Sequence, residues 1–238
     1  MEVRLLRYTH DGVNLVAEAS KITTDENLGE NEKVFEMLIN NDYGSALEHI
    51  VFTFELRNIS IAISRELLEH RIASHTARST RYCDESSLSY HIPERVLEKY
   101  DGKGRDLYCR IIEEAIKNYT RLYDELLKLG YSKRDAREVA RYALPLARHT
   151  TYVWTVNLRS LINFLGLRLC VRSAPEMREL AERIKECVSE VYPVLKRIGC
   201  RGLNLGVCPE NEARPEECPY RGLIPTKKEL QSSRVNPE

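Results

Sequence analysis

The chain has 238 residues, of which 42% are hydrophobic and 30% charged, so it can bury one well-packed core. Its 36 basic and 36 acidic side chains give a formal net charge of zero, which argues against nucleic-acid binding through a generally basic surface. No apolar run approaches the roughly 18 residues of a membrane span, and residues 1–12 lack the apolar core of a signal peptide. We therefore expect a cytoplasmic protein with no membrane or nucleic-acid partner.

The first third of the chain predicts strands mixed with helices. Residues 2–7 and 49–56 read as strands, the second because it is rich in β-branched and aromatic side chains. Residues 30–41 read as a helix, and a further helix covers 61–72 with Ser60 as its N-cap. This helix should continue into a cationic loop.

The rest of the chain up to residue 198 predicts mostly helix. The fold class is therefore α+β, with helices dominant around a central mixed or antiparallel sheet. The expected helices are 105–129, 133–143, 158–171 and 174–198, and the expected strand is 150–156.

The cationic segment 69–82, EHRIASHTARSTRY, contains arginine but no lysine. The planar guanidinium suits two-pronged contact with phosphate or carboxylate, so Ser79 and Arg81, with Arg78 beside them, are candidates to bind an anion. The alternative is a solvated loop with surface salt bridges. Cys83 could act as a nucleophile, although a lone cysteine is more often a small apolar side chain.

Residues 157–168, NLRSLINFLGLR, place polar groups on an otherwise apolar helix. Asn157 could cap this helix, and Arg159 and Asn163 form an i,i+4 pair on one face. Together with Arg168, these groups must be satisfied by a partner, which is either a ligand or an ordinary structural contact at a subunit interface.

The composition changes after residue 198, which predicts a core domain of residues 1–198 and an extension of residues 199–238. Three of the seven cysteines, Cys200, Cys208 and Cys218, lie in this extension among glycine and proline. They predict a zinc or iron–sulfur site. Its fourth ligand could be Cys170 or Cys187, or its absence could leave an iron open for substrate. The alternative is a flexible tail of free thiols.

Two separated signatures resemble the flavin-dependent thymidylate synthases, the ThyX family. That family carries Arg-His-Arg, seven residues and a serine, and here His70-Arg71, residues 72–78 and Ser79 match all but the first letter. LEHIVFTFEL precedes this motif and STRY ends it, and ALPLARHTTYVWTVNLRSLINFLGLRL resembles the second signature. The resemblance covers roughly residues 1–197 and implies a ThyX-like fold.

The resemblance also implies a reaction. A family member methylates dUMP to dTMP with methylene-tetrahydrofolate, or an archaeal pterin analogue, and reduced FAD, draws electrons from NADPH, and is a homotetramer. The positions that match FAD contacts are Ser45, His70, Arg71, Ile72, Asn157, Arg159 and Asn163. The positions that match dUMP contacts are Ser79, Arg81, Arg141 and Arg168, and Arg168 matches the catalytic arginine that helps to ionise the pyrimidine.

Several positions depart from the family pattern, and Glu69, which stands where the first arginine of the motif should be, is the most consequential. Glu66 replaces a neutral glutamine, so two carboxylates would repel a bound phosphate unless Arg78 and Arg172 compensate for them. These departures leave open a divergent paralogue with another nucleotide or carbon donor, or a non-catalytic nucleotide-binding homologue. The other departures are Tyr43, Thr76 and Ala77.

Overall fold

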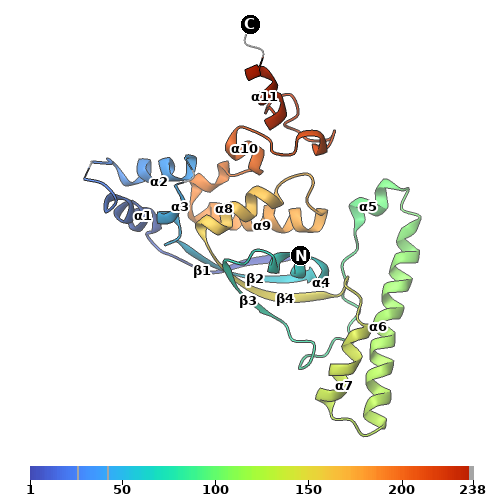
Figure 1. Ribbon diagram of the computed structural model, residues 1–238. Coiled ribbons are helices and arrows are strands. Elements are labelled where there is room, and N and C mark those ends of the chain that lie inside the picture. Colours follow the sequence, from blue (N-terminus) through green and yellow to red (C-terminus); the bar gives the residue numbers. More distant parts are fainter. Residues whose placement is uncertain (26, 42, 236–238) are drawn as a thin grey trace. The chain divides into compact units, whose positions relative to one another are not determined.

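The computed structural model describes residues 1–25, 27–41 and 43–235 and has the predicted α+β class (Figure 1). The strands are β1 (Glu2–Tyr8), β2 (Val51–Ser60), β3 (Ala73–Ala77) and β4 (His149–Asn157). The α-helices are α1 (Gly12–Lys21), α2 (Asn31–Asn40), α3 (Gly44–Leu47), α4 (Ile61–Leu68), α5 (Glu94–Lys99), α6 (Gly104–Lys128), α7 (Lys133–Ala140), α8 (Leu158–Arg168), α9 (Pro175–Val191), α10 (Arg201–Leu205) and α11 (Lys227–Val235). Short 3-10 helices are η1 (Arg141–Ala143), η2 (Pro193–Arg197) and η3 (Asn211–Ala213).

The four strands form one sheet in the order β1-β2-β4-β3. Neighbouring strands are antiparallel, because in each pair the end of one strand bonds to the start of the other. The bonds are Thr9 N to Val51 O (3.0 Å), Leu158 N to Ile50 O (2.8 Å) and Arg78 N to Thr151 O (2.8 Å).

The chain divides into two compact units, which are described separately below. The first unit contains Met1–Glu2, Glu55–Glu69 and His75–Trp154. The second contains Val3–Phe54, His70–Ser74 and the chain from Thr155 onward.

In the first unit, the entry to α4 follows the predicted capping pattern. The Ser60 hydroxyl accepts a hydrogen bond from the backbone N–H of Ile63 at 3.2 Å, which confirms the expected N-cap. The helix ends at Leu68, four residues before the predicted end, and residues 73–77 form β3 instead of a loop. That strand forms because it pairs with distant residues of β4, a contact that local periodicity does not reveal.

Also in the first unit, α6 packs along α7. Helix α6 has 25 residues, yet of its side chains only Ile116 and Tyr119 are fully buried, so it presents a narrow apolar face. It gives way to Gly130, whose backbone φ of +89° suits glycine, and this confirms the predicted end.

In the second unit, α8 packs against α9. The buried side chains of α9 recur every three or four residues, as expected of an amphipathic helix. They include Met177, Leu180, Ala181, Ile184 and Val188. The predicted helix 174–198 is interrupted before Pro193, since proline lacks the N–H that an α-helix needs, and the chain continues as η2.

Candidate functional site

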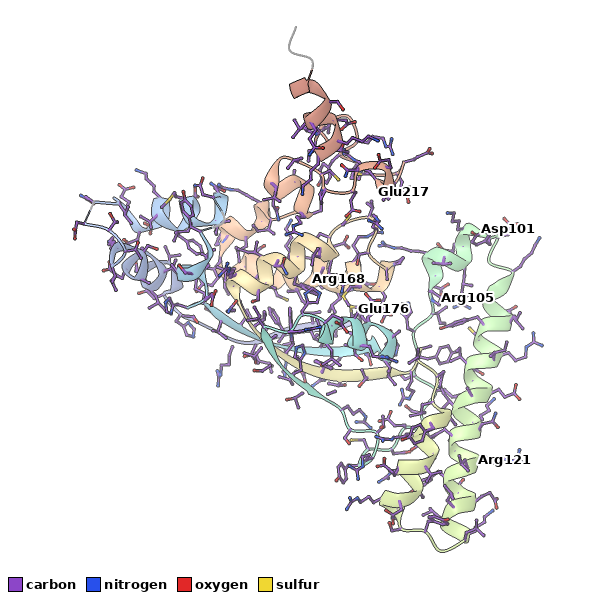
Figure 2. The ribbon with its side chains drawn as sticks, in the orientation of Figure 1. Asp101, Arg105, Arg121, Arg168, Glu176 and Glu217 are labelled. Carbon is purple, nitrogen blue, oxygen red and sulfur yellow. The ribbon has the colours of Figure 1, made fainter. Side chains whose placement is uncertain are left out.

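Two side chains from the two sequence signatures meet in the second unit. Arg168 lies on α8 (Figure 2), where its Nε donates to His70 Nε2 at 3.0 Å. The His70 ring stands edge-on to Phe164 with centroids 4.9 Å apart. A guanidinium can only donate hydrogen bonds, so Nε2 is the acceptor nitrogen. His70 is therefore neutral in this arrangement and carries its proton on Nδ1.

A second group of polar side chains lies where α3 packs against α8. Arg159 Nη1 donates to the Glu48 carboxylate at 2.7 Å, and both side chains are about half exposed. Gly44 makes this possible, because a Cβ at that position would lie 2.3 Å from Arg159 Nε. Ser45, the next residue of α3, is exposed.

The start of α8 is capped as predicted. Asn157 Oδ1 accepts from the backbone N–H of Ser160 at 2.8 Å, so the amide oxygen serves the helix and its NH2 group remains the part suited to a ligand. Asn163, one turn beyond Arg159, is exposed. Arg71 and Ile72, which follow His70, are also exposed.

In the first unit, the STRY segment forms a tight turn. The Ser79 carbonyl accepts from the backbone N–H groups of Tyr82 (3.2 Å) and Cys83 (3.0 Å), and the Ser79 hydroxyl accepts from Arg81 N at 3.4 Å. Ser79 and Arg81 are therefore held close together by local bonds.

Arg141 joins this turn through a carboxylate. Glu138 forms an ion pair with Arg81 and accepts from Arg141 Nη2 at 2.6 Å. The three side chains are each about one third exposed. Two of the predicted phosphate-binding arginines are thus gathered around one anionic group, which shows that their guanidiniums can address the same anion.

The two arginines expected to offset Glu69, Arg78 and Arg172, pair with other carboxylates. Arg78 donates from Nε to Glu85 at 2.8 Å, and this hydrogen bond raises the pKa of Arg78. Arg172 pairs with Glu210.

The predicted metal site is also not formed. No group of three His, Cys, Asp or Glu side chains in the described part of the chain is close enough to hold a metal ion, and all seven cysteines are free thiols. The three tail cysteines occupy different local structures. Cys200 precedes α10, Cys208 is buried in a bridge to Thr226, and Cys218 lies in a turn bonded to Pro215.

Sequence reasoning missed the carboxylates around the arginines. Glu138 lies three residues before Arg141, so helical spacing could have identified this pair. Glu48 and Glu85 pair with residues distant in sequence or across a loop, and no local pattern indicates them.

None of the described helices is long and apolar enough to cross a membrane.

Comparison with known proteins identifies the family of the chain. Residues 4–194 match the family described as thymidylate synthase complementing protein. The chain belongs to this family. A flavin-dependent thymidylate synthase of Pyrococcus abyssi is 38% identical over 183 residues, which are 73% of this chain and 71% of that protein. One of Pyrococcus furiosus is 32% identical over 237 residues, which are 92% of this chain and 93% of that protein.

A solved structure extends the family relationship to the fold. The UMP/dUMP methylase PolB from Streptomyces cacaoi, bound with 5-Br dUMP, is 25% identical, has a TM-score of 0.67, and matches 82% of this chain and 92% of its own. The resemblance to the thymidylate synthase complementing family and the ThyX-like fold expected from the two signatures are thus confirmed.

Proposed function

We propose that this member of the thymidylate synthase complementing family is a flavin-dependent thymidylate synthase, an FAD-dependent methyltransferase that converts dUMP to dTMP. The observation that carries the proposal is the bond between His70 and Arg168, which joins the two sequence signatures across 98 residues. The names of the relatives support the same activity.

The second unit offers the residues that would hold FAD. A dinucleotide presents phosphate, ribityl and ring acceptors, and the donors at α3 and α8 have the matching chemistry. These donors are Ser45, Asn157, Arg159 and Asn163, with His70, Arg71 and Ile72 on the preceding segment. The span from Asn157 to Arg168 along the helix is roughly 16 Å, enough to address an extended ligand at several points. Bound in its reduced form, FAD supplies hydride.

Arg168 is assigned the catalytic role. Its Nε is engaged with His70, which fixes the plane of the guanidinium. A guanidinium oriented beside N3 and O4 of uracil stabilises the pyrimidine anion and so activates C5. His70 contributes as an acceptor that holds Arg168 in this plane.

The first unit offers the residues that would hold the phosphate of dUMP. Ser79, Arg81 and Arg141 supply one hydroxyl and two guanidiniums, and Glu138 already brings the two guanidiniums together. A phosphate that reaches them would replace the carboxylate as their partner.

The remaining partners follow from family membership. We propose methylene-tetrahydrofolate or a pterin analogue as carbon donor, NADPH as reductant, a homotetrameric assembly and a cytoplasmic location. The extension beyond residue 198 is proposed to lie outside the catalytic domain.

An absorption spectrum of protein purified without air tests the cofactor, and conversion of dUMP to dTMP with a methylene-folate and NADPH tests the reaction. We expect a flavin spectrum, and an Arg81→Met variant should raise the KM for dUMP at least about tenfold. Arg105→Met is the matched control, because Arg105 pairs with Glu94 on α5 in the same unit and is half exposed. A colourless protein that also refuses added FAD would refute the proposal.

Glu69 favours a second candidate, a paralogue acting on another pyrimidine nucleotide or carbon donor. This carboxylate is exposed at the end of α4 and stands where the family motif has an arginine. UMP is the first alternative to test, since the PolB neighbour is named for both nucleotides. A kcat/KM that is higher for UMP than for dUMP, and that reverses in Glu69→Arg, would favour this candidate.

A further inference from the structure

Glu85 is the most buried acidic side chain among the described residues, with 2% of its surface exposed. Each of its two carboxylate oxygens meets a different arginine. Oε1 accepts from Arg78 Nε at 2.8 Å, and Oε2 pairs with Arg148 Nη2 at 3.0 Å. A carboxylate buried to this degree is stable in its charged form only when such partners surround it.

Arg148 anchors this arrangement to the sheet. It is 4% exposed and stands immediately before β4. Its guanidinium donates four hydrogen bonds besides its ion pair with Glu85, which accounts for its tolerance of burial. The acceptors besides Glu85 Oε2 are Ser89 O (2.6 Å), Ser87 Oγ (3.0 Å), His149 O (3.3 Å) and Glu85 O (3.4 Å).

Arg78 connects the buried pair of Glu85 and Arg148 to the turn at residues 79–83. It immediately precedes Ser79, and its backbone N–H donates to Thr151 O of β4 at 2.8 Å. Its side chain reaches across the turn, where Nη2 also donates to Asp84 O at 2.9 Å. The segment from Arg78 to Glu85 is thereby closed at both ends, with Ser79 and Arg81 inside it.

We propose that Glu85 is a positioning residue, whose buried carboxylate holds Arg78 and thereby fixes the turn that presents Ser79 and Arg81 to the nucleotide phosphate. This inference rests on the proposed function, because it assigns Glu85 to the same nucleotide site. Arg78 is a tether in this account, since its Nε and Nη2 donate to Glu85 and Asp84.

Titration of dUMP into the flavin-loaded protein tests the proposal, together with steady-state kinetics. Glu85→Gln keeps the shape of the side chain and removes its charge. It should weaken dUMP binding by about tenfold to a hundredfold through the KM, because a displaced turn misplaces two phosphate contacts. The kcat and the affinity for FAD should stay close to those of the unmodified protein.

A second variant keeps the test decisive where Glu85→Gln does not fold. Arg78→Met retains the pair between Glu85 and Arg148 and cuts only the tether, and Arg78 is 39% exposed, so its replacement is tolerated. It should raise the KM for dUMP in the same way. Glu113→Gln is the matched control, because Glu113 accepts a hydrogen bond from Tyr90 and contacts no arginine of the turn.

The outcomes separate the possibilities. If Glu85→Gln binds dUMP as tightly as the unmodified protein, or more tightly, the positioning role is wrong, and tighter binding identifies Arg78 as a direct ligand freed by the substitution. Unchanged binding in Arg78→Met also overturns the inference, as does a parallel loss of FAD and dUMP affinity, which indicates general unfolding. Unmodified protein that binds neither dUMP nor UMP overturns the proposed function itself.

Discussion

Replacement of Arg148 by methionine should destabilise the protein strongly. Methionine matches the length of the arginine stem but leaves the Glu85 carboxylate, 2% exposed, with Arg78 as its remaining arginine partner. Removal of one partner from a buried ion pair typically costs about 3–5 kcal/mol of unfolding free energy. For a chain of this size, each kcal/mol lowers Tm by roughly 2–4 °C, so Tm should fall by roughly 6–20 °C.

Urea titration and thermal scanning of the purified variants measure this loss. The double variant Arg148→Met with Glu85→Gln should be more stable than the sum of the two single losses predicts, because the uncompensated charge is gone. Arg105→Met, which breaks a half-exposed pair with Glu94, should cost at most about 1 kcal/mol. A loss below about 1 kcal/mol for Arg148→Met, or additive losses in the double variant, would refute this reasoning.

Three further predictions concern cofactor binding, catalysis and the pH dependence of stability. Gly44→Ala should weaken FAD binding by about tenfold with little change in Tm, since the new Cβ displaces the Arg159 side chain; unchanged flavin titration would contradict this. Arg168→Met should lower kcat by at least about a hundredfold while dUMP still binds, and His70 should lose its orienting partner; kinetics with retained kcat would argue against the catalytic role. Burial lowers the pKa of His149 from 6.5 to about 4. Between these pH values the unfolded chain binds a proton that the folded chain does not, so the free energy of unfolding falls as the pH drops from about 6.5 toward 4. In His149→Asn, the free energy of unfolding should vary less with pH over that window.

Local signals in the sequence were sufficient to predict a contact where a residue bonds to near neighbours in the chain. Ser60 and Asn157 were predicted as caps and both accept from an N–H three residues on. Strand β3 was missed because it is short, mostly exposed and formed by pairing with β4. The pair between Glu85 and Arg148 lies beyond any local pattern, since 63 residues separate the two side chains.

In the candidate site, too, some residues could be predicted from the sequence and others could not. The resemblance supplied the arginines and amides, whose roles remain predictions, but it did not supply what holds them. His70 and Arg168 are brought together by tertiary packing. Glu138 lies outside both signatures, and Glu48, in the flank of the first, was not singled out. The tail cysteines are the reverse case, a site that the composition predicted and the structure does not form. In the described residues these cysteines lie in different local structures and do not group as metal ligands.

The carboxylate of Glu138 has a consequence for how the proposed nucleotide site would behave in salt solution. Arg81 and Arg141 already carry an internal counterion, so the local charge that faces solvent is smaller than two guanidiniums alone would give. Small anions such as chloride and inorganic phosphate must compete with a tethered carboxylate, which a dianionic nucleotide with further contacts can displace more readily. The affinity for nucleotide should therefore vary less with ionic strength than the number of arginines implies.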